Sequence, residues 1–403
     1  MSTAGVGPPV TERSLRMEMK ADQRWIMDRF VRSVGMDALR PGVIGTWLEL
    51  GFDYNDLQKT TARVTSQATF VEEWARTGRM LEVLANEAEA AGHAVSGMDY
   101  RLRSSFAFGT AHRRIFAATA QKVDYVEAVR RNYDKVLGPG LVRRVEIPFG
   151  GTTFPGLLHL PSGAGPFPAV VVLPGMDMIK EFIPDPRRNV FTRRGLAALT
   201  IDGPGQGESN VRGLRLTPTN GEEAASAAID LLVSHPAIDP GRIGAFGMSL
   251  GSYTAARLAA TEPRLRGTVS FEGGIFYDKV RWVTEAEPHF FYNLRYMTGL
   301  DGEELFAALR AMTMMGYEPS IRAPYLLMQS THDELTPLEE AQRLFDAVAG
   351  PKEMILYSGE THVLGGVIAE ALAEAVDWLA DRLAGVAIVT DGRVRVLERR
   401  WPV

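Results

Sequence analysis

The chain has 403 residues, of which 45% are hydrophobic and 23% charged, and its formal net charge is −5. This is an ordinary globular composition with room for about two domains, and it argues against a disordered, collagen-like or coiled-coil chain. The sequence contains no cysteine, which excludes disulfides, thiolate nucleophiles, iron–sulfur clusters and cysteine-bound zinc. Any nucleophile must therefore be an oxygen or a nitrogen.

The charge pattern disfavours two classes of partner. Arginine doublets such as Arg113-Arg114 and Arg143-Arg144 are scattered among acidic residues, so they form no basic tract for nucleic acid. No apolar run approaches the roughly 18 residues that a membrane span needs. Residues 1–19 lack the apolar core of a secretory signal. We therefore expect a cytoplasmic protein that binds neither nucleic acid nor a membrane.

Residues 12 to about 138 predict helices. Apolar residues recur at helical spacing in two stretches, at Ile26, Phe30 and Val34, and at Phe70, Trp74, Leu81, Leu84 and Ala88. Thr69 and Glu72 have the spacing of a capping box at the start of the second stretch, and Gly92 is placed to end it. Residues 100–137 are again helical in pattern.

The pattern changes near Gly138-Pro139-Gly140, where we predict a boundary between a helical cap domain, residues 1–138, and a catalytic domain, residues 139–403. Two strands follow, at 142–147 and 152–160. Short apolar runs separated by helix-like segments come next, at 169–173, 197–201, 243–246, 267–271, 325–329 and 354–357. This alternation predicts a mostly parallel sheet with helices on both faces.

Two segments depart from this alternation. Residues 275–320 are longer than a simple crossover and rich in aromatic side chains, which predicts a helical excursion over the sheet that either packs there or contacts a ligand. Residues 386–397, around Asp391-Gly392, predict an appended hairpin.

The strongest catalytic signal is the run from Gly247 to Gly251, which reads G-M-S-L-G and lies between the apolar run 243–246 and a helix-like stretch. The pattern alone is weak, so its context carries the inference. A nucleophile on a sharp strand-to-helix turn has a strained backbone and needs glycine beside it, because neighbouring backbone packs close. Ser249 is therefore the predicted nucleophile.

A serine hydroxyl needs a base to take its proton and a carboxylate to orient that base. The run 325–329 leads into a polar loop that contains Asp333, and the run 354–357 leads into a loop that contains His362. The carboxyl ends of parallel strands meet at one edge of a sheet, so the chain order Ser249, Asp333, His362 predicts a catalytic triad.

Two other residues compete for the acid and base roles. Glu272 follows the run 267–271, so it is a rival acid or a second polar group in the pocket. His332 is adjacent to Asp333, and neighbouring side chains diverge, so we expect His362 as the base.

The site also needs donors for a developing oxyanion and, as far as the sequence indicates, no cofactor. The amides of Leu250, after the nucleophile, and of Met176, after the first parallel strand, are the candidate donors. The run 202–209 is rich in glycine, but its spacing does not fit a dinucleotide loop and no lysine follows. No clustered metal-ligand pattern is visible, so we predict neither cofactor nor metal.

These residues resemble the α/β-hydrolase superfamily over about residues 140–385. The helical N-terminal segment, the run 173–177 followed by Lys180-Glu181, and the run 271–274 resemble, more narrowly, the group that contains 2,6-dihydroxypseudooxynicotine hydrolase and the FrsA-like esterases. The resemblance implies an α/β-hydrolase fold with the N-terminal helices as a cap over the site.

The resemblance also implies an activity: hydrolysis, by a serine enzyme, of a carbon–carbon bond next to a ketone in an aromatic or polyketide-like small molecule. Ser249 would be the nucleophile, His362 the base and then the acid, and Asp333 the orienting acid. The oxyanion donors would be Met176 and Leu250. Asp177 and Glu272 are expected on the substrate side, and a homodimer is one assembly that the resemblance suggests.

Two alternatives remain open from the sequence. The first is a carboxylesterase or lactonase with the same triad, because one site can attack either carbonyl. The second belongs to another class: a hydrolase-fold protein that binds a ligand or a partner and turns over little.

Overall fold

The structure is a computed structural model that describes residues 29, 33, 43–137, 142–286, 288–389 and 391–398. The predicted stripe at Ile26, Phe30 and Val34 and the predicted boundary at 138–140 lie outside these residues. The division into residues 1–138 and 139–403 therefore stays a prediction.

Within the described residues, nine strands form one sheet in the order β1-β2-β4-β3-β5-β6-β7-β8-β9. β1 and β2 pair antiparallel, β2 pairs antiparallel with β4, and the remaining neighbours are parallel. The strands are β1 (Val142–Phe149), β2 (Thr152–His159), β3 (Phe167–Leu173), β4 (Ala197–Ile201), β5 (Ile238–Met248), β6 (Leu265–Phe271), β7 (Tyr325–Ser330), β8 (Lys352–Tyr357) and β9 (Arg393–Leu397). The predicted mostly parallel sheet is confirmed.

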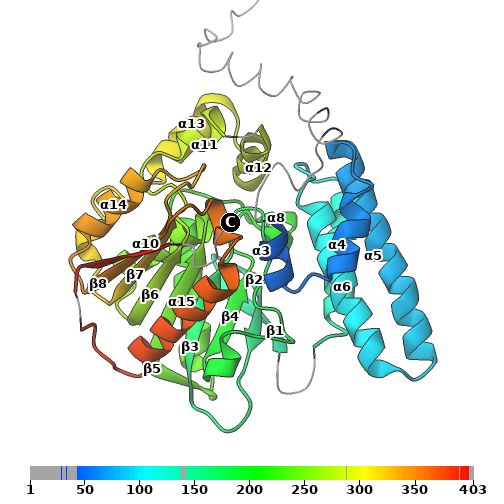
Figure 1. Ribbon diagram of the computed structural model, residues 1–403, viewed down its shortest axis with the longest axis horizontal. Coiled ribbons are helices and arrows are strands. Elements are labelled where there is room, and N and C mark those ends of the chain that lie inside the picture. Colours follow the sequence, from blue (N-terminus) through cyan, green and yellow to red (C-terminus); the bar gives the residue numbers. More distant parts are fainter. Residues whose placement is uncertain are drawn as a thin grey trace, which may run out of the picture.

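The helices that connect these strands pack on both faces of the sheet (Figure 1). They are α8 (Gly207–Val211), α9 (Asn220–Ser234), α10 (Leu250–Thr261), α14 (Leu338–Ala347) and α15 (Ile368–Leu383), with short 3₁₀ turns η2 (Thr192–Arg194), η3 (Glu318–Ser320) and η4 (His362–Leu364). The excursion between β6 and β7 is helical, as expected, and consists of α11 (Val280–Thr284), α12 (Pro288–Thr298) and α13 (Gly302–Ala311). Figure 1 shows these three helices together at one end of the sheet.

The sheet is buried on both faces because its strands alternate between two cores. Ala169, Val171 and Leu173 of β3 point into a core shared with α9, α10, α14 and the excursion. Val170 and Val172 point into a second core, which is shared with α15 and with the N-terminal helices. Side chains that alternate between two faces, both of them apolar, are typical of a parallel sheet with helices packed on both sides.

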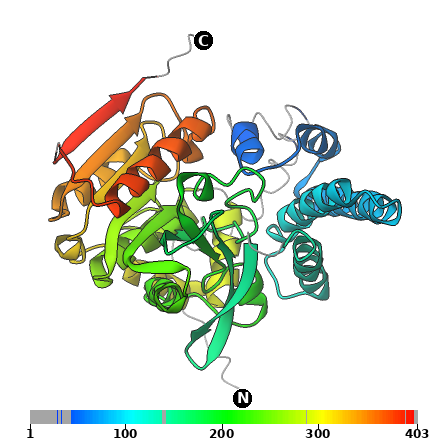
Figure 2. The same ribbon diagram turned by 90° about the horizontal axis from the view of Figure 1, so that it is seen from below.

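The N-terminal helices stand beside the sheet (Figures 1 and 2). They are α3 (Val43–Glu49), α4 (Tyr54–Thr61), α5 (Gln67–Ala90), α6 (Ala94–His112) and α7 (Ala120–Tyr133). Aromatic side chains of these helices and of the link between α3 and α4 pack against one another and against Phe182 of the loop after β3: Phe52 of the link and Phe106 of α6 both lie within 6 Å of the Phe182 ring. None of the helices in the described ranges is both long and apolar enough to cross a bilayer.

Two local predictions are wrong. The capping box of α5 is formed by Ser66 and Thr69, three residues before the predicted pair, because Ser66 accepts from the Thr69 amide and the Thr69 hydroxyl reaches back to the Ser66 amide. The predicted C-terminal hairpin is absent from the described part of the chain, where β9 adds to the edge of the sheet parallel to β8. Gly92, at a φ of 79°, does end α5 as predicted.

Candidate active site

Ser249 lies between the end of β5 and the start of α10, in a backbone conformation (φ 54°, ψ −119°) that non-glycine residues rarely adopt. Its amide donates to the carbonyls of Phe271 and Glu272, at 3.1 and 2.9 Å, which holds the turn against the end of β6. A side chain at Gly251 would overlap the Leu173 carbonyl, and one at Gly247 would overlap the Gly251 carbonyl. The two glycines of the motif are therefore required by close backbone packing.

His362 joins Ser249 to Asp333. Its Nε2 lies 2.9 Å from the Ser249 Oγ, and its Nδ1 lies 2.8 Å from the Asp333 Oδ2. An ionised carboxylate only accepts hydrogen bonds, so Nδ1 carries the proton and Nε2 accepts from the serine hydroxyl. Three side chains from three separate loops thus form one continuous hydrogen-bonded chain at the carboxyl edge of the sheet.

The surroundings of Asp333 favour its ionised form. Burial alone would raise its pKa, but the neighbouring His362 and the backbone amides of Thr336 and Leu335 lower the pKa below its usual value. Both amides donate to Asp333 Oδ1 at 2.8 Å. The side-chain Nε2 of Gln329 donates to Oδ2 at 3.0 Å. The carboxylate is thus held by groups on its own loop and on the preceding strand, and His362 meets a fixed acceptor.

Glu272 lies next to this chain but is not joined to the histidine. Its Oε2 is 3.9 Å from the His362 Nδ1, compared with 2.8 Å for Asp333. It accepts a hydrogen bond from the Ser330 hydroxyl at 3.1 Å, and the residue is fully buried. Burial and the adjacent Asp333 charge raise the Glu272 pKa well above its ordinary value. Of this carboxyl pair, Glu272 is therefore the member that holds its proton more tightly, and Asp333 is the member that ionises more readily.

Ligand atoms of Glu272, Asp333 and His362 all lie within 4.8 Å of one another, a spacing that a metal ion could also use. Two of these residues are already engaged: His362 bridges Ser249 and Asp333, and Asp333 is bonded by two backbone amides. The hydrogen-bond partners around the group are those of an acid–base cluster.

The loop after β3 passes directly beside Ser249. A side-chain carbon placed on Gly175 would lie 3.4 Å from the Cβ of Ser249, so this part of the loop packs against the serine, and Met176 is the next residue. Leu250 begins α10, whose N-terminus carries unpaired amides and a partial positive charge. The two predicted oxyanion donors thus flank Ser249 on different segments.

Asp177, the next residue of this loop, faces the N-terminal helices. Its carboxylate lies 3.5 Å from the Arg113 guanidinium at the end of α6, and Arg113 also lies over the Trp47 ring of α3. Gly109 of α6 packs closely on Phe182 and Ile179 of the same loop. The N-terminal helices therefore contact the loop that carries Met176.

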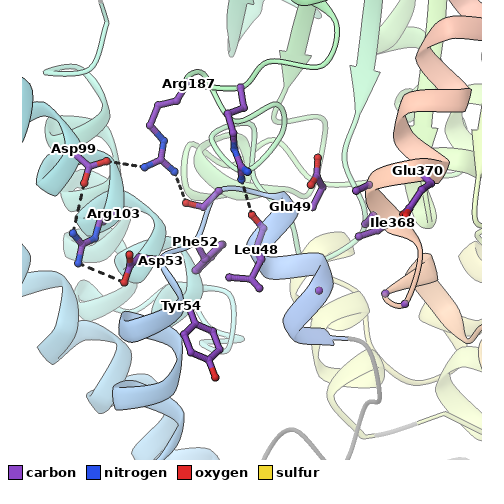
Figure 3. A pocket seen from close by; sticks show the side chains of 16 residues that line it. Leu48, Glu49, Phe52, Asp53, Tyr54, Asp99, Arg103, Arg187, Ile368 and Glu370 are labelled. Atoms are coloured by element: carbon purple, nitrogen blue, oxygen red, sulfur yellow. Dashed lines mark hydrogen bonds and ion pairs between the residues drawn. The ribbon is translucent and has the colours of Figure 1, made fainter. Parts of the chain in front are cut away.

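A pocket of about 720 Å³ is lined by α3 and the residues after it, by α6, by the loop after β3 and by the start of α15 (Figure 3). Leu48 and Glu49 of α3 and Ile368 and Glu370 of α15 are among its lining residues. Its floor includes Gly365, three residues after His362, and a side chain on Gly45 would overlap the Gly365 carbonyl. Helix α3 is thus seated on the segment that follows the histidine.

The structure brings Ser249, Asp333 and His362 together and leaves His332 outside this group: His332 is exposed and its ring pairs with the Thr331 hydroxyl. Gln329 and Arg113 were not anticipated as parts of the site. Gln329 ends a predicted strand that points at the site, so its position in the sequence was a usable signal. No sequence pattern indicated Arg113, because Asp177, its partner in the structure, is 64 residues away along the chain.

The chain is similar to known hydrolases and esterases. A family model described as esterase FrsA-like matches residues 55–285. The 2,6-dihydropseudooxynicotine hydrolase of Paenarthrobacter nicotinovorans is 27% identical over 361 residues, which cover 88% of this chain and 94% of that protein. Esterase FrsA of Escherichia fergusonii is 37% identical over 130 residues, 32% of this chain and 31% of that protein.

A crystal structure of 2,6-dihydroxy-pseudo-oxynicotine hydrolase is similar in fold, with a TM-score of 0.76 and 26% identity. The match covers 89% of this chain and 99% of that one. It therefore includes the N-terminal helices as well as the sheet.

Proposed function

This chain belongs to the FrsA-like esterase family and is an enzyme of the α/β-hydrolase fold, and from that premise we propose that it is a serine hydrolase that cleaves a carbon–carbon bond next to a ketone in an aromatic or polyketide-like small molecule. The observation that carries the proposal is the hydrogen-bonded chain from Ser249 through His362 to Asp333, with distances of 2.9 and 2.8 Å.

In the first step, the Ser249 Oγ attacks the ketone carbon and its proton passes to the His362 Nε2. The Nδ1–H of His362 remains bonded to Asp333, whose negative charge stabilises the imidazolium that forms. The lowered pKa of Asp333 suits this role, because the carboxylate must stay ionised while the histidine is charged.

The attacked oxygen becomes an oxyanion, and we assign its stabilisation to the amides of Met176 and Leu250. Backbone donors in a water-poor site need little reorganisation when charge develops. Met176 and Leu250 are both buried, which keeps competing water away from these amides.

Breaking a carbon–carbon bond is harder than breaking an ester, because the leaving group departs as a carbanion instead of an alkoxide. The substrate must therefore supply an electron sink, such as an electron-rich ring protonated at the departing carbon or a β-carbonyl that leaves as an enol. The proton on His362 Nε2 balances this step: it moves to the departing carbon, and the acyl group stays on Ser249. Water, activated by the same histidine, then releases the carboxylic acid and restores the serine.

Near full-length similarity to the 2,6-dihydropseudooxynicotine hydrolase supports carbon–carbon cleavage, since it includes the N-terminal helices. A carboxylesterase or lactonase is the second candidate, favoured by the 37% identity to esterase FrsA over a 130-residue segment. Glu272 was expected on the substrate side, but its carboxyl is fully buried beside Asp333. We therefore propose that it supports the acid loop. Asp177, whose carboxylate lies 3.5 Å from Arg113, is the other residue that we propose for the substrate side.

A matched substrate set tests the proposal. An ortho-dihydroxyaryl alkyl ketone, a β-diketone and a phenyl ester that share one acyl group would be given to the wild-type protein and to Ser249→Ala, and products would be identified by mass. We expect the wild type to release the common acid together with the arene or methyl ketone. Turnover of the ester alone would establish the esterase. No turnover, with Ser249 inert toward a fluorophosphonate, would indicate a binding protein.

A further inference from the structure

The glycine-rich run 202–209 has no role in the catalytic steps proposed above, but it is bonded to the loop after β3, which carries Met176. We propose that Gln206 of this run is a positioning residue that aims the Met176 amide at the oxyanion formed on Ser249. This inference rests on the proposed function, because it assigns the direction of one of the proposed oxyanion donors.

The side chain of Gln206 contacts two consecutive carbonyls of the loop after β3. Its Nε2 lies 2.8 Å from the Gly175 oxygen and 3.3 Å from the Pro174 oxygen. Its Oε1 accepts from the Gly203 amide at 3.2 Å, which fixes which end of the side-chain amide faces the loop. Gln206 therefore acts as a donor toward Pro174 and Gly175 and as an acceptor toward its own segment.

Because the peptide bond is planar, the contact with the Gly175 carbonyl also fixes the direction of the Met176 N–H. In a trans peptide, the carbonyl of one residue and the N–H of the next lie in one plane and point in opposite directions. A bond that holds the Gly175 carbonyl toward Gln206 thus holds the Met176 N–H away from Gln206. The Gly175 carbonyl also accepts from the Met178 amide at 3.1 Å, which closes the local turn, so Gln206 supplies the link to a separate segment.

Gln206 can hold the Gly175 carbonyl in one direction because the segment around Gln206 is itself fixed by hydrogen bonds. The Asp202 carboxylate accepts from the amides of Lys180 and Glu208, at 2.8 and 2.9 Å. The Asn210 side chain bonds the carbonyls of Gly205 and of Tyr296 in α12, at 2.8 and 3.0 Å. The run is thus fixed both to itself and to the excursion.

The loop after β3 is held by the same run at its far end. The Lys180 ammonium is buried and lies 2.9 Å from Asp202 and 3.1 Å from Glu208. It also lies 2.9 Å from Glu181. The segment from Pro174 to Lys180, with Met176 near its middle, is therefore fastened at both ends to residues 202–208.

The test measures covalent labelling of Ser249 by a fluorophosphonate, since phosphonylation also builds negative charge on an oxygen beside the nucleophile. Gln206→Met keeps the length of the side chain and removes both donor and acceptor. Gln342→Met, on the exposed face of α14, makes the same chemical change away from the site and is the matched control. For each protein we would measure the maximal labelling rate kinact, the reversible constant KI and the melting temperature.

We expect Gln206→Met to lower kinact about 10- to 100-fold, less than the complete loss of an oxyanion donor, while KI and the melting temperature stay near the wild-type values. Gln342→Met should match the wild type in all three. Gln206→Glu sharpens the test, because an ionised carboxylate repels the two carbonyls whereas a protonated one can donate. Its kinact relative to the wild type should therefore rise as the pH falls toward 5.

Two failures are distinguishable. If the wild type does not label at Ser249, the proposed function is wrong and this inference falls with it. If the wild type labels but Gln206→Met labels at the same rate, the triad stands and the role of Gln206 is refuted. If Gln206→Met is markedly less stable than the wild type, Gln206→Glu decides the question. The role of Gln206 is refuted if the ratio of the kinact of Gln206→Glu to that of the wild type does not change with pH.

Discussion

The candidate active site and the N-terminal helices are attached to the same sheet in different ways. Around Asp333, the partners are backbone amides and buried side chains on strand ends, at 2.8 to 3.0 Å. The N-terminal helices are attached through aromatic packing on Phe182 and through arginines that are partly exposed. Arg187, with 35% of its side chain exposed, reaches Asp99 of α6 and the Gly51 carbonyl (Figure 3).

The sheet edge and the N-terminal helices therefore have different roles. Acid–base chemistry needs fixed donors and acceptors, and the carboxyl edge of a parallel sheet supplies them from several loops at once. The helices contribute none of the three side chains of the hydrogen-bonded chain, yet they contact the loop of Met176 and the segment after His362. We therefore expect changes at the sheet edge to abolish chemistry and changes at the helices to alter stability or substrate preference.

The largest effect is expected for Asp333→Asn. An amide at this position cannot hold the proper histidine tautomer, so kcat should fall by about four orders of magnitude on any substrate that the wild type turns over. The melting temperature of the variant shows whether the loss is chemical or structural.

Glu272→Gln is the matched partner of that variant. Because burial and the Asp333 charge raise the pKa of Glu272, a neutral amide of the same shape is a mild change there, and we expect kcat to fall by about tenfold or less. If Glu272→Gln were the more damaging change, the assignment of the acid to Asp333 would be wrong.

Lys180→Met should have the largest effect on folding stability. Its ammonium lies among Glu181, Asp202 and Glu208, and removal of one partner from a buried ion cluster leaves uncompensated charge. Such changes cost about 3–5 kcal/mol of the free energy of unfolding. Denaturant unfolding of the wild type and the variant measures this difference, and a loss below about 1 kcal/mol would show that the cluster does not fasten the loop.

Glu208 gives this cluster a pH dependence. Burial would raise its pKa, but Lys180, Arg212 and Arg144 lower the pKa to about 2, from an ordinary value of 4.5. A carboxylate with a lowered folded-state pKa stabilises the fold above its unfolded-state pKa, and this stabilisation is lost as the pH falls toward 2. The free energy of unfolding should therefore decline less between about pH 6 and pH 3 in Glu208→Gln than in the wild type. Equal declines would contradict the lowered pKa.

The smallest effect is expected at the helices. Arg187→Ala removes a partly exposed ion pair with Asp99, which is worth about 1 kcal/mol or less. The buried Asp185 loses one partner but keeps Arg188 and the backbone amide of residue 187, so the melting temperature should fall by only a few degrees. Ser249 labelling should be unchanged. Arg193→Ala, an exposed position in η2, is the control. Loss of labelling in Arg187→Ala would mean that the helices are part of the chemical machinery after all.

The sheet and the three hydrogen-bonded side chains of the candidate site could be predicted from the sequence because both depend on local patterns. Apolar runs marked the strands, and Ser249, Asp333 and His362 each followed one of these runs, where a parallel sheet gathers its strand ends. The choice of Asp333 over Glu272 also agrees with the distances to His362.

What the sequence could not predict depends on contacts between distant segments. Gln206 reaches Gly175 across 31 positions, and no local pattern encodes such a contact. Asp391-Gly392 suggested a hairpin, but Asp391 instead accepts from the Lys352 amide, and β9 continues the edge of the sheet in parallel to β8. The capping box was misplaced because Thr69 can serve either as a cap or, as here, as the third residue after one.

The most direct test of the central claim is peptide mapping by mass spectrometry after fluorophosphonate treatment of the wild type and of Ser249→Ala. Nucleophilic catalysis by the chain from Ser249 to Asp333 predicts one adduct, on the peptide that contains Ser249, and none in the variant. An adduct on another residue, or equal labelling of both proteins, would contradict the assignment of Ser249 as the nucleophile.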